Sequence, residues 1–358
     1  MQIAIVGLPG SGQSTVFAAL AGQSAPQTGQ GRHGELERAV VKVPDPRLDA
    51  LAELFHPRKV TPAEVQYVAP PELKRSEQRT EGWVAMLTHL RQADAIVQVV
   101  RAFDDPSYPH PSGSVDPWRD LDDLQAELLL ADLMVVERRL ERLERETRGG
   151  AKGPQVQERD LLTRLRLRLD EGLPLRGMEM EAAERKLVRG FGFLTAKPVL
   201  ILVNTGSEGL NGTGVRLAEK ADVLGAHYLA IDGKLERELA ELDPAEQAEM
   251  LIAFDLVEPA LFRAIRASYE LLDLISFFTV GEDEVRAWPI VRGTPAWEAA
   301  GEIHSDISRG FIRAEVVPAA DLLRVGSLAE ARRQALLRSE GRMYQVQDGD
   351  VISYLFNV

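Results

Sequence analysis

The chain begins with an apolar run, a glycine-rich segment and a helical pattern, in that order. Residues 2–6 read QIAIV, residues 7–14 read GLPGSGQS, and residues 15–20 read TVFAAL. A short apolar run bounded by glycine predicts a buried strand, and the segment after the glycines has the pattern of a helix start. The order therefore predicts a strand, a glycine loop and a helix.

A second apolar run, residues 198–203 (PVLILV), ends at Asn204. A continuous apolar run without alternation is typical of a strand that is buried on both faces of a parallel sheet. In such α/β sheets, ligands bind beyond the carboxyl ends of the strands. The two runs together predict an α/β domain with a parallel sheet.

A long amphipathic pattern occupies residues 121–143. Apolar residues recur there at three- and four-residue spacing, which predicts a helix with one apolar face. The apolar positions are Leu121, Leu124, Leu128, Leu133, Val135, Val136, Leu140 and Leu143. Residues 149–154 (GGAKGP) interrupt the pattern, and Leu162, Leu165 and Leu169 resume it. We therefore expect a helical hairpin with a flexible tip.

Alternating apolar and polar positions follow in the last quarter of the chain. Residues 276–280 (SFFTV) and 311–317 (FIRAEVV) have the pattern of strands. They predict a compact β-rich domain at the C-terminal end, with Trp288 in its core.

The composition narrows the possible functions. A chain of 358 residues exceeds the usual length of one domain, so we expect two or three. Because there is no cysteine and the six histidines are scattered, disulfides are excluded and a zinc site is not expected. No leader or membrane-length apolar run stands out, so the cytoplasm is the expected location and no membrane partner is expected.

The net charge of −13 argues against general coating of nucleic acid. Neutralising phosphates needs clustered Lys and Arg side chains, which an acidic chain offers only locally. We therefore expect no DNA partner, and any RNA contact must be local.

The glycine loop is a candidate phosphate-binding loop (P-loop). Glycines let backbone N–H groups approach phosphate oxygens, and a helix N-terminus adds the positive end of a dipole. The candidate residues for nucleotide are Gly7, Pro9, Gly10, Ser11, Gly12, Gln13, Ser14 and Thr15, and Ser14 is also the candidate ligand of Mg²⁺. The alternative is a strand–turn–helix corner whose glycines serve backbone geometry alone.

Gln13 stands where the strict P-loop pattern has lysine. A neutral amide replaces a charge-assisted hydrogen bond of roughly 1.5–3 kcal/mol by one of roughly 0.5–1.5 kcal/mol. Phosphoryl transfer depends on positive charge around the β- and γ-phosphates, so the substitution weakens hydrolysis more than binding. No residue is assigned a catalytic role.

Longer segments carry a more specific resemblance. They are residues 41–49 (VKVPDPRLD), 56–63 (HPRKVTPA), 93–101 (ADAIVQVVR), 281–288 (GEDEVRAW), 309–316 (RGFIRAEV), 347–352 (QDGDVI) and 356–358 (FNV). In order and spacing they resemble the YchF family of Obg-like ATPases over essentially the whole chain.

The resemblance implies a P-loop GTPase-like parallel sheet with a helical-hairpin insertion and a C-terminal β-rich TGS domain. It also implies hydrolysis of ATP or GTP and association with the ribosome. The expected boundaries are residues 1–118 and 190–275 for the nucleotide-binding domain, 119–189 for the coiled-coil insertion and 276–358 for the TGS domain.

The resemblance makes Asn204 the start of the base-recognition segment, in which the family has Glu three residues later. Ser207 stands at that position and Glu208 follows it, so guanine recognition is doubtful and adenine is weakly favoured. Gly233 joins Asn204 among the candidate nucleotide-binding residues. Alternatively, Asn204 ends its strand and bonds to the neighbouring P-loop without any nucleotide.

The segment that should sense the γ-phosphate and magnesium departs from the family pattern. The family reads Asp-Ile-Ala-Gly-Leu where this chain has residues 69–73 (APPEL), so Ala69 replaces the Asp and Glu72 the Gly. Mg²⁺ binding is therefore doubtful. Residues 23–34, the first switch region, look like a mobile loop, and Lys74 or Arg75 is a remote candidate to replace the missing lysine charge.

The implied ribosome or RNA partner is assigned to the coiled coil and the TGS domain. Residues 137–168 contain ten basic and six acidic residues, which also fits a solvated helix face with ion pairs. In the TGS domain the candidate contact residues are Arg286, His304, Arg309 and Arg313, of which Arg313 also fits an ordinary solvent-facing strand position.

These observations leave three hypotheses. The first is a YchF-like nucleotide-binding factor that acts at the ribosome, in translation or stress regulation, with impaired or absent hydrolysis. The second is a pseudo-GTPase scaffold that binds no nucleotide, as the joint changes at Gln13, Ala69 and Glu72 suggest. The third, a working ATPase rescued by Lys74 or by a partner's residue, has the least support.

Overall fold

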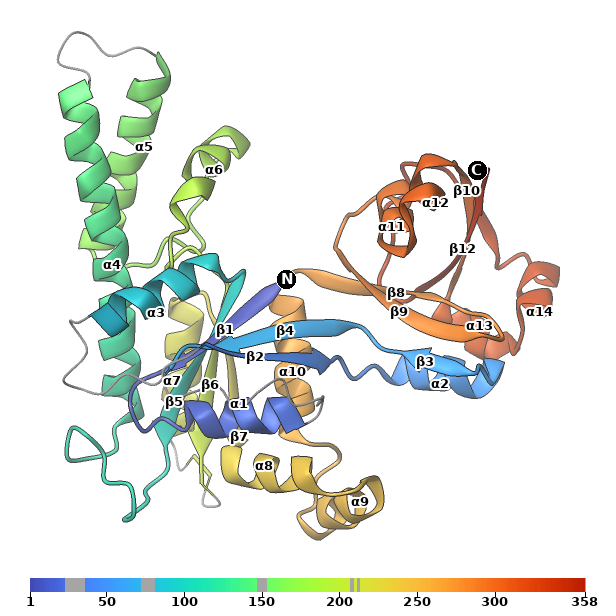
Figure 1. The fold of residues 1–358 in the computed structure, drawn as a ribbon, viewed down its shortest axis with the longest axis horizontal. Helices are drawn as coiled ribbons and strands as arrows, with labels where there is room; N and C mark the ends of the chain where they lie inside the picture. Colours follow the sequence, from blue (N-terminus) through green and yellow to red (C-terminus); the bar gives the residue numbers. More distant parts are fainter. Residues whose placement is uncertain (23–35, 72–80, 147–152, 207–208, 211–212, 358) are drawn as a thin grey trace. The chain divides into compact units, whose positions relative to one another are not determined.

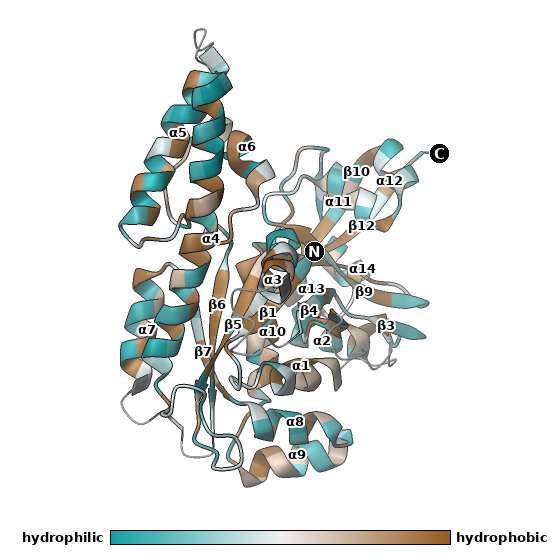
Figure 2. Cartoon of the chain, turned by 60° about the vertical axis from the view of Figure 1, so that its left-hand side comes forward, coloured by the Kyte–Doolittle hydropathy of each residue, from teal (hydrophilic) through white to brown (hydrophobic). Residues whose placement is uncertain are grey.

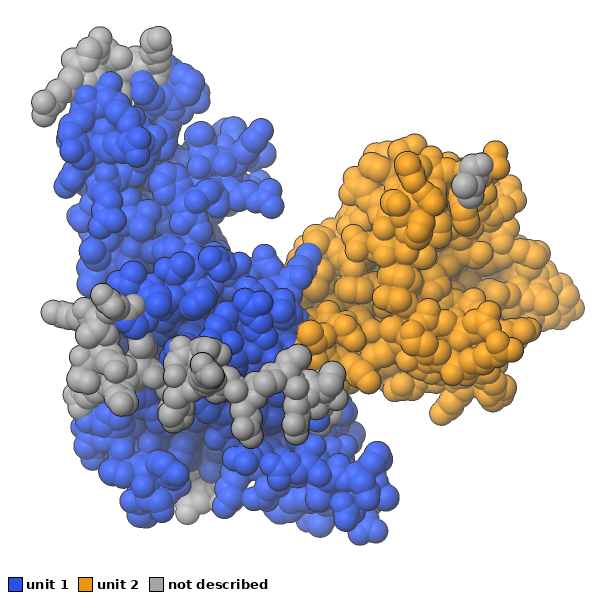
Figure 3. Space-filling view, viewed as in Figure 1, with its two compact units in different colours: residues 1–39, 66–264 blue, residues 40–65, 265–358 orange. Residues whose placement is uncertain are grey.

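The computed structural model describes residues 1–22, 36–71, 81–146, 153–206, 209–210 and 213–357. The chain forms two compact units, which have different colours in Figure 3. Unit 1 comprises residues 1–39 and 66–264, and unit 2 comprises residues 40–65 and 265–358. Residues 40–65 thus group with the C-terminal part, whereas the three-domain division made from the sequence remains a proposal.

Unit 1 is built on a six-stranded sheet with the order β2-β4-β1-β5-β6-β7 (Figure 1). Its strands are β1 (Gln2–Gly7), β2 (Glu37–Lys42), β4 (Glu64–Ala69), β5 (Ala95–Ala102), β6 (Val199–Thr205) and β7 (His227–Asp232). The pairs of β1 with β4 and β5, of β5 with β6, and of β6 with β7 are all parallel. The predicted parallel sheet is therefore confirmed, and the carboxyl ends of β1, β5 and β6 meet at one edge.

Helices cover the sheet because alternate residues of the buried strands point to opposite faces. The helices of this unit outside the insertion are α1 (Gln13–Gly22), α3 (Glu81–Gln92), α7 (Thr213–Val223), α8 (Gly233–Glu241), α9 (Pro244–Ala253) and α10 (Ala260–Leu271), which continues into unit 2. Leu90 of α3, Leu217 of α7 and Leu124 of the insertion helix α4 (Pro117–Glu146) are fully or almost fully buried in one core. Val6, Val100 and Val203 of the strands belong to the same core.

The predicted helical hairpin is present. It consists of α4 (Pro117–Glu146) and α5 (Gly153–Asp170), followed by α6 (Ala182–Val188) and a short 3₁₀ helix (Arg189–Phe191). Val136, Leu140 and Leu143 of α4 pack against Leu162 and Leu165 of α5, as the leucine spacing predicted. The expected break at residues 149–154 lies largely outside the described residues.

A buried carboxylate fixes the base of this hairpin. Asp132 of α4 is fully buried and accepts hydrogen bonds from the backbone N–H groups of Leu194 and Thr195, at 3.0 and 2.7 Å. It also accepts one from Arg91 of α3, at 3.0 Å. A buried carboxylate with several donors is well satisfied. Asp132 thus ties the insertion to the segment that leads back into β6.

Unit 2 contains the second sheet, with the order β11-β10-β12-β8-β9-β3. Its strands are β3 (Lys59–Thr61), β8 (Leu274–Thr279), β9 (Glu284–Val291), β10 (Phe311–Pro318), β11 (Arg338–Glu340) and β12 (Asp350–Phe356). Its helices are α2 (Pro46–Phe55), α11 (Ala296–Ile303), α12 (Ser305–Arg309), α13 (Ala319–Val325) and α14 (Leu328–Arg333). The predicted C-terminal β-rich domain is confirmed, and Trp288 is partly buried against its core.

The segment of residues 40–65 joins this sheet through β3. Lys59, Val60 and Thr61 pair in parallel with Glu284, Val285 and Arg286 of β9. The Lys59 ammonium also lies 2.9 Å from the Glu284 carboxylate, and the Thr61 hydroxyl donates to the same carboxylate at 2.5 Å. The N-terminal half of the chain thereby supplies an edge strand to the C-terminal sheet.

Candidate nucleotide-binding site

The glycine loop lies between β1 and α1 and needs its glycines for two physical reasons. Gly10 and Gly12 have φ values of 78° and 87°, in the left-handed region that favours glycine. A Cβ atom on Gly7 would lie 2.2 Å from the Ser11 Oγ, and one on Gly12 would lie 2.1 Å from the Asn204 Nδ2. The loop therefore requires glycine at these positions, and the N-terminus of α1 follows it directly.

Gln13 is 3% exposed, and its side chain is engaged within the protein. The backbone N–H of Gly7 donates to the Gln13 Oε1 at 3.0 Å, and the Gln13 Nε2 donates to the carbonyl of Pro70 at 2.8 Å. The amide thus closes the loop on itself and ties it to the chain just after β4. A lysine ammonium cannot reproduce both bonds, because it has no acceptor.

Asn204 at the end of β6 holds the loop from another side. Its Nδ2 donates to the Ser11 carbonyl at 3.1 Å, and its Oδ1 accepts the Gly233 N–H at 3.0 Å. A Cβ on Gly233 would lie 2.7 Å from the same Oδ1, so this residue must be small. Asn204, Gly233 and the P-loop therefore meet at one place. The bond to the P-loop is the geometry expected of a strand-ending asparagine, and its role toward a nucleotide remains a proposal.

The sequence analysis gave no role to Arg101, which is the largest fully buried side chain among the described residues, with 1% exposure. Its guanidinium donates to the carbonyls of Phe103, Gly10 and Tyr108 at 3.1, 3.4 and 2.7 Å, and lies 4.5 Å from the centre of the Phe103 ring. In the part of the chain that the structure describes, it forms no ion pair with Asp or Glu. A buried positive charge therefore stands directly behind the P-loop.

His110 and Asp120 also lie behind the loop, where sequence reasoning did not place them. The His110 Nε2 lies 2.8 Å from the Asp120 Oδ2, and the Ser112 N–H donates to the His110 Nδ1 at 3.1 Å. Both ring nitrogens of His110 thus lie against protein partners. The position of these two residues in the sequence could have indicated them, because residues 103–116 follow β5 and therefore lie at the edge of the sheet where α/β proteins bind ligands.

The cavity behind the loop has a volume of only about 10 Å³. That is close to the space of one water molecule, so neither a phosphate nor a purine fits inside it. It is lined by Leu8, Pro9, Ser11, Gln98, Val99, Val100, Arg101, His110, Asp120 and Leu124. On the loop itself, Gly10 and Ser14 are exposed and Thr15 is half-buried.

The residues fit a nucleotide phosphate better than they fit magnesium. Ser14 offers one hydroxyl, but the strand β4 ends at the buried, apolar Ala69 where the family pattern has Asp. No group of three His, Asp or Glu side chains with metal-binding geometry occurs among the described residues. Glu72, Lys74, Arg75, Ser207, Glu208 and residues 23–34 lie outside the described ranges.

The candidate partner surfaces are ordinary polar surfaces in their local contacts. On the hairpin, Arg139 pairs with Glu158 at 2.7 Å and Arg142 with Glu146 at 2.7 Å. In unit 2, Arg309 pairs with Asp306, and the exposed His304 accepts the N–H of the same Asp306. The Arg313 guanidinium lies 3.9 Å from the Glu315 carboxylate. The Arg286 guanidinium lies 3.9 Å from the centre of the Trp288 ring.

Comparison with known proteins extends over the whole chain. Residues 274–357 match the family YchF-GTPase_C, described as a protein of unknown function. A protein of Bacillus subtilis named "Ribosome-binding ATPase YchF" is 38% identical, with 99% of this chain and 98% of that protein covered. "Obg-like ATPase 1" of Oryza sativa is 34% identical, with 100% and 92% covered.

A solved structure is also similar to this chain over nearly its whole length. The YchF GTPase of Schizosaccharomyces pombe superposes with a TM-score of 0.86 at 29% identity, covering 99% of this chain and 97% of that one. None of the described helices is long and apolar enough to span a membrane.

Proposed function

The chain belongs to the YchF family of Obg-like ATPases, and we propose on this basis that it is a cytoplasmic, ribosome-binding P-loop protein. We further propose that it binds a purine nucleotide weakly and hydrolyses it slowly or not at all. The backbone of the loop, with Gly10 and Gly12 in left-handed conformations, supports the binding. The side chains around the loop support the loss of hydrolysis.

The engagement of Gln13 is the observation that carries this proposal. Its amide bonds to Pro70 and Gly7, so the side chain is held within the protein and brings no positive charge to the β- and γ-phosphates. Both ring nitrogens of His110 have protein partners, and Ala69 supplies no metal ligand. Positioned positive charge and an oriented nucleophile are the main requirements of phosphoryl transfer.

The ribosome part of the proposal rests on the relatives and on intact modules. The Bacillus subtilis relative is named a ribosome-binding ATPase, and the alignment spans both proteins almost completely. The helical hairpin and the C-terminal domain, to which we assign ribosome or RNA contacts, both have complete apolar cores. These modules therefore keep their form although the nucleotide site has changed.

Calorimetric titration of the purified protein with ATP, GTP and their diphosphates, with and without Mg²⁺, tests the nucleotide part. We expect weak binding that Mg²⁺ strengthens little, a small rise in melting temperature and turnover at background. Micromolar binding with multiple turnovers would contradict the proposal. Co-sedimentation with purified 70S ribosomes tests the other part, and a chain that stays in the supernatant would refute it.

A second candidate function is a scaffold that binds no nucleotide. The observation that favours it is that Gln13, Asn204 and Arg101 all bond to the loop backbone, so the loop is stabilised by its own protein. The double variant Gln13→Lys with Ala69→Asp separates the two candidates. A gain of nucleotide binding over the parent supports the weak-binding proposal, whereas no binding by either protein supports the scaffold.

A further inference from the structure

Helix α9 (Pro244–Ala253) is held firmly at its start although none of its residues is buried. The Asp243 carboxylate accepts the N–H groups of Ala245 and Glu246 at 2.9 and 3.0 Å, and the Glu246 carboxylate accepts the Asp243 N–H at 3.3 Å. The Gln247 side chain donates to the Leu239 carbonyl of α8 at 2.9 Å. A ten-residue helix is marginal alone, so this reciprocal capping box fixes it.

The end of α9 is fixed as well. The Leu256 N–H donates to the Leu251 carbonyl at 2.8 Å, the Asp255 N–H donates to the Ile252 carbonyl at 3.1 Å, and Asp255 has a φ of 54°. These are the two bonds and the left-handed residue of a Schellman motif. Leu251 and Leu256 are half-buried, as in the apolar contact that usually accompanies it.

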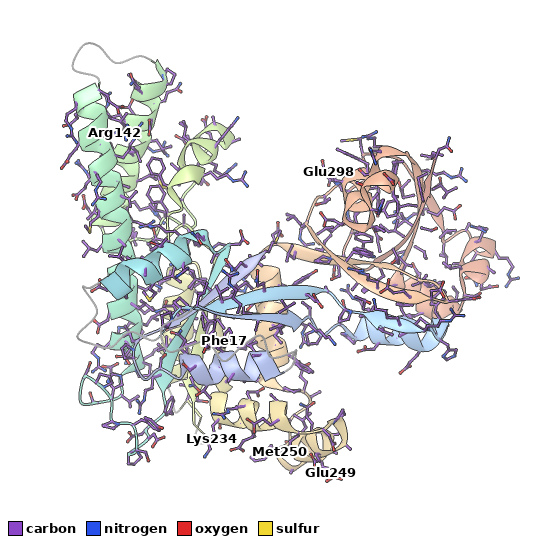
Figure 4. The ribbon with its side chains drawn as sticks, in the orientation of Figure 1. Phe17, Arg142, Lys234, Glu249, Met250 and Glu298 are labelled. Carbon is purple, nitrogen blue, oxygen red and sulfur yellow. The ribbon has the colours of Figure 1, made fainter. Side chains whose placement is uncertain are left out.

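This turn presents three large apolar side chains to the solvent. Ile252, Phe254 and Val257 are 79%, 55% and 100% exposed. Figure 2 shows hydrophobic positions on α9, and Figure 4 shows the side chains of Glu249 and Met250 on the same helix. Isolated exposed apolar residues are ordinary, but three within six residues on a rigid turn indicate an interaction site.

Within residues 243–258, all the charged side chains are acidic. Residues 243–258 contain five acidic residues and no Lys or Arg. They are Asp243, Glu246, Glu249, Asp255 and Glu258. We call Ile252, Phe254 and Val257, together with the four acidic residues from Asp243 to Asp255, the α9 surface. It repels nucleic-acid phosphates and anionic lipid headgroups, and pairing with the same surface of a second copy brings like charges together.

We propose that the α9 surface docks a protein segment in which apolar side chains are surrounded by Lys and Arg. Such a segment covers the three apolar side chains and places its cations against the acidic rim, so that apolar burial gives affinity and charge gives orientation. This contact is separate from the hairpin and the C-terminal domain. The proposal goes beyond the function proposed above, and it rests on the proposed ribosome association because its partner is sought on the ribosome.

Photo-crosslinking to purified 70S ribosomes tests the proposal. The full-length chain carries p-benzoylphenylalanine at Phe254, and a matched protein carries it at Val223 of α7, which is 77% exposed. We expect position 254 to crosslink to a ribosomal protein with a Lys- and Arg-rich surface, and position 223 to crosslink much less. Adducts with ribosomal RNA, with a second copy of the chain, or equally from both positions would overturn it.

Co-sedimentation of variants gives the affinity. The triple variant Ile252→Ser, Phe254→Ser and Val257→Ser should bind ribosomes about tenfold more weakly, as expected for loss of the apolar centre of an interface. The control Val215→Ser with Val223→Ser removes exposed apolar groups from α7 and should bind like the parent. All these side chains are exposed, so melting temperatures should not change, and equal binding by both variants would overturn the proposal.

A charge variant separates the two contributions. Glu246→Gln with Glu249→Gln should lower ribosome affinity at low salt and make it less dependent on salt, because rim charges act through screened attraction. Tighter binding by this variant would show that the surface faces RNA and overturn the proposal. If the unmodified chain does not sediment with ribosomes, ribosome association itself fails, and the proposed contact fails with it. A parent that sediments while all variants match it overturns the α9 contact alone.

Discussion

Gln13 shows how one side chain changes the character of a phosphate loop. In the P-loop pattern a lysine at this position reaches the β- and γ-phosphates as a positive charge. Here the amide accepts from Gly7 and donates to Pro70, so the residue organises the loop and connects it to the end of β4. In this structure the Gln13 side chain therefore stabilises the loop and its connection to β4.

Replacing Gln13 by Lys should destabilise the protein and increase its affinity for phosphate. The Gly7 N–H loses its acceptor, which costs about 1–2 kcal/mol for a buried donor, while the new ammonium attracts anions. Urea unfolding gives the first quantity, and titration with tripolyphosphate gives the second.

The matched control for this prediction is Gln13→Glu. A carboxylate still accepts from Gly7, but it loses the bond to Pro70 and repels phosphate, so stability should fall without any gain in anion binding. A Gln13→Lys protein that is as stable as the parent would contradict the assigned role of the amide.

Arg101 should be intolerant of conservative change. It is buried and serves three backbone carbonyls through the fixed fork of its guanidinium, which the ammonium of lysine does not reproduce. Arg101→Lys should lower the free energy of unfolding by roughly 2–3 kcal/mol, and Arg101→Met by more, because carbonyls lose their donors. Chemical denaturation measures both. The exposed Arg313→Lys is the control, and an equal effect at the two positions would disprove the prediction.

At the scale of elements, the motif of residues 44–47 has a structural role in unit 2. Asp45 caps α2 by accepting the Arg47 N–H at 3.0 Å, and Pro46 occupies the first turn. The Arg47 guanidinium binds the carboxylates of Asp45 and Asp348 at 2.8 and 2.7 Å and lies 5.3 Å from the Phe278 ring centre. The motif joins α2 to the turn before β12.

This junction predicts a pH dependence of stability. Burial raises the pKa of Asp348, but hydrogen bonds from Arg47 and from the Ser276 N–H outweigh it and hold the pKa below its usual value. A depressed carboxyl pKa adds stability above the unfolded value of about 3.9, and this stability is lost as the pH falls through the folded pKa. Asp348→Asn should therefore lower the free energy of unfolding at neutral pH by about 1 kcal/mol. It should also make this free energy less dependent on pH in the acid range.

Urea unfolding between neutral and strongly acid pH measures this effect. The control is Asp273→Asn, whose ion pair with Arg292 is longer and more exposed, at 3.2 Å. Exposed ion pairs contribute little, so the control should follow the parent curve. Parallel curves for Asp348→Asn and the parent would refute the role of the junction.

At the scale of the whole molecule, nucleotide binding and ribosome binding should be uncoupled. The γ-phosphate normally acts through an Asp that anchors magnesium and a Gly amide that senses the nucleotide state. Ala69 and Glu72 stand at these positions, so a bound nucleotide has little means to bias the rest of the chain. Ribosome affinity should therefore be the same with ATP, with ADP and without nucleotide, within about twofold. Co-sedimentation under the three conditions checks this, and a large preference for one state would contradict it.

The sequence was sufficient for the architecture because apolar periodicity reports which faces are buried. The runs at residues 2–6 and 198–203 became β1 and β6, and the leucine spacing from 121 to 169 became α4 and α5. The glycine pattern likewise predicted the loop between β1 and α1. These elements are determined by residues that are close together in the sequence, so their pattern can be recognised without the tertiary structure.

Contacts between distant residues were decided only in three dimensions. Pro70 and Gly7 give Gln13 its role, Gly10 and Tyr108 give Arg101 its role, and β9 takes β3 into the second sheet. A sequence identifies a side chain but not the donors and acceptors around it. The sequence therefore determined that a glycine loop with glutamine at the lysine position lies between a strand and a helix, and only the tertiary structure showed that this glutamine bonds to the loop itself.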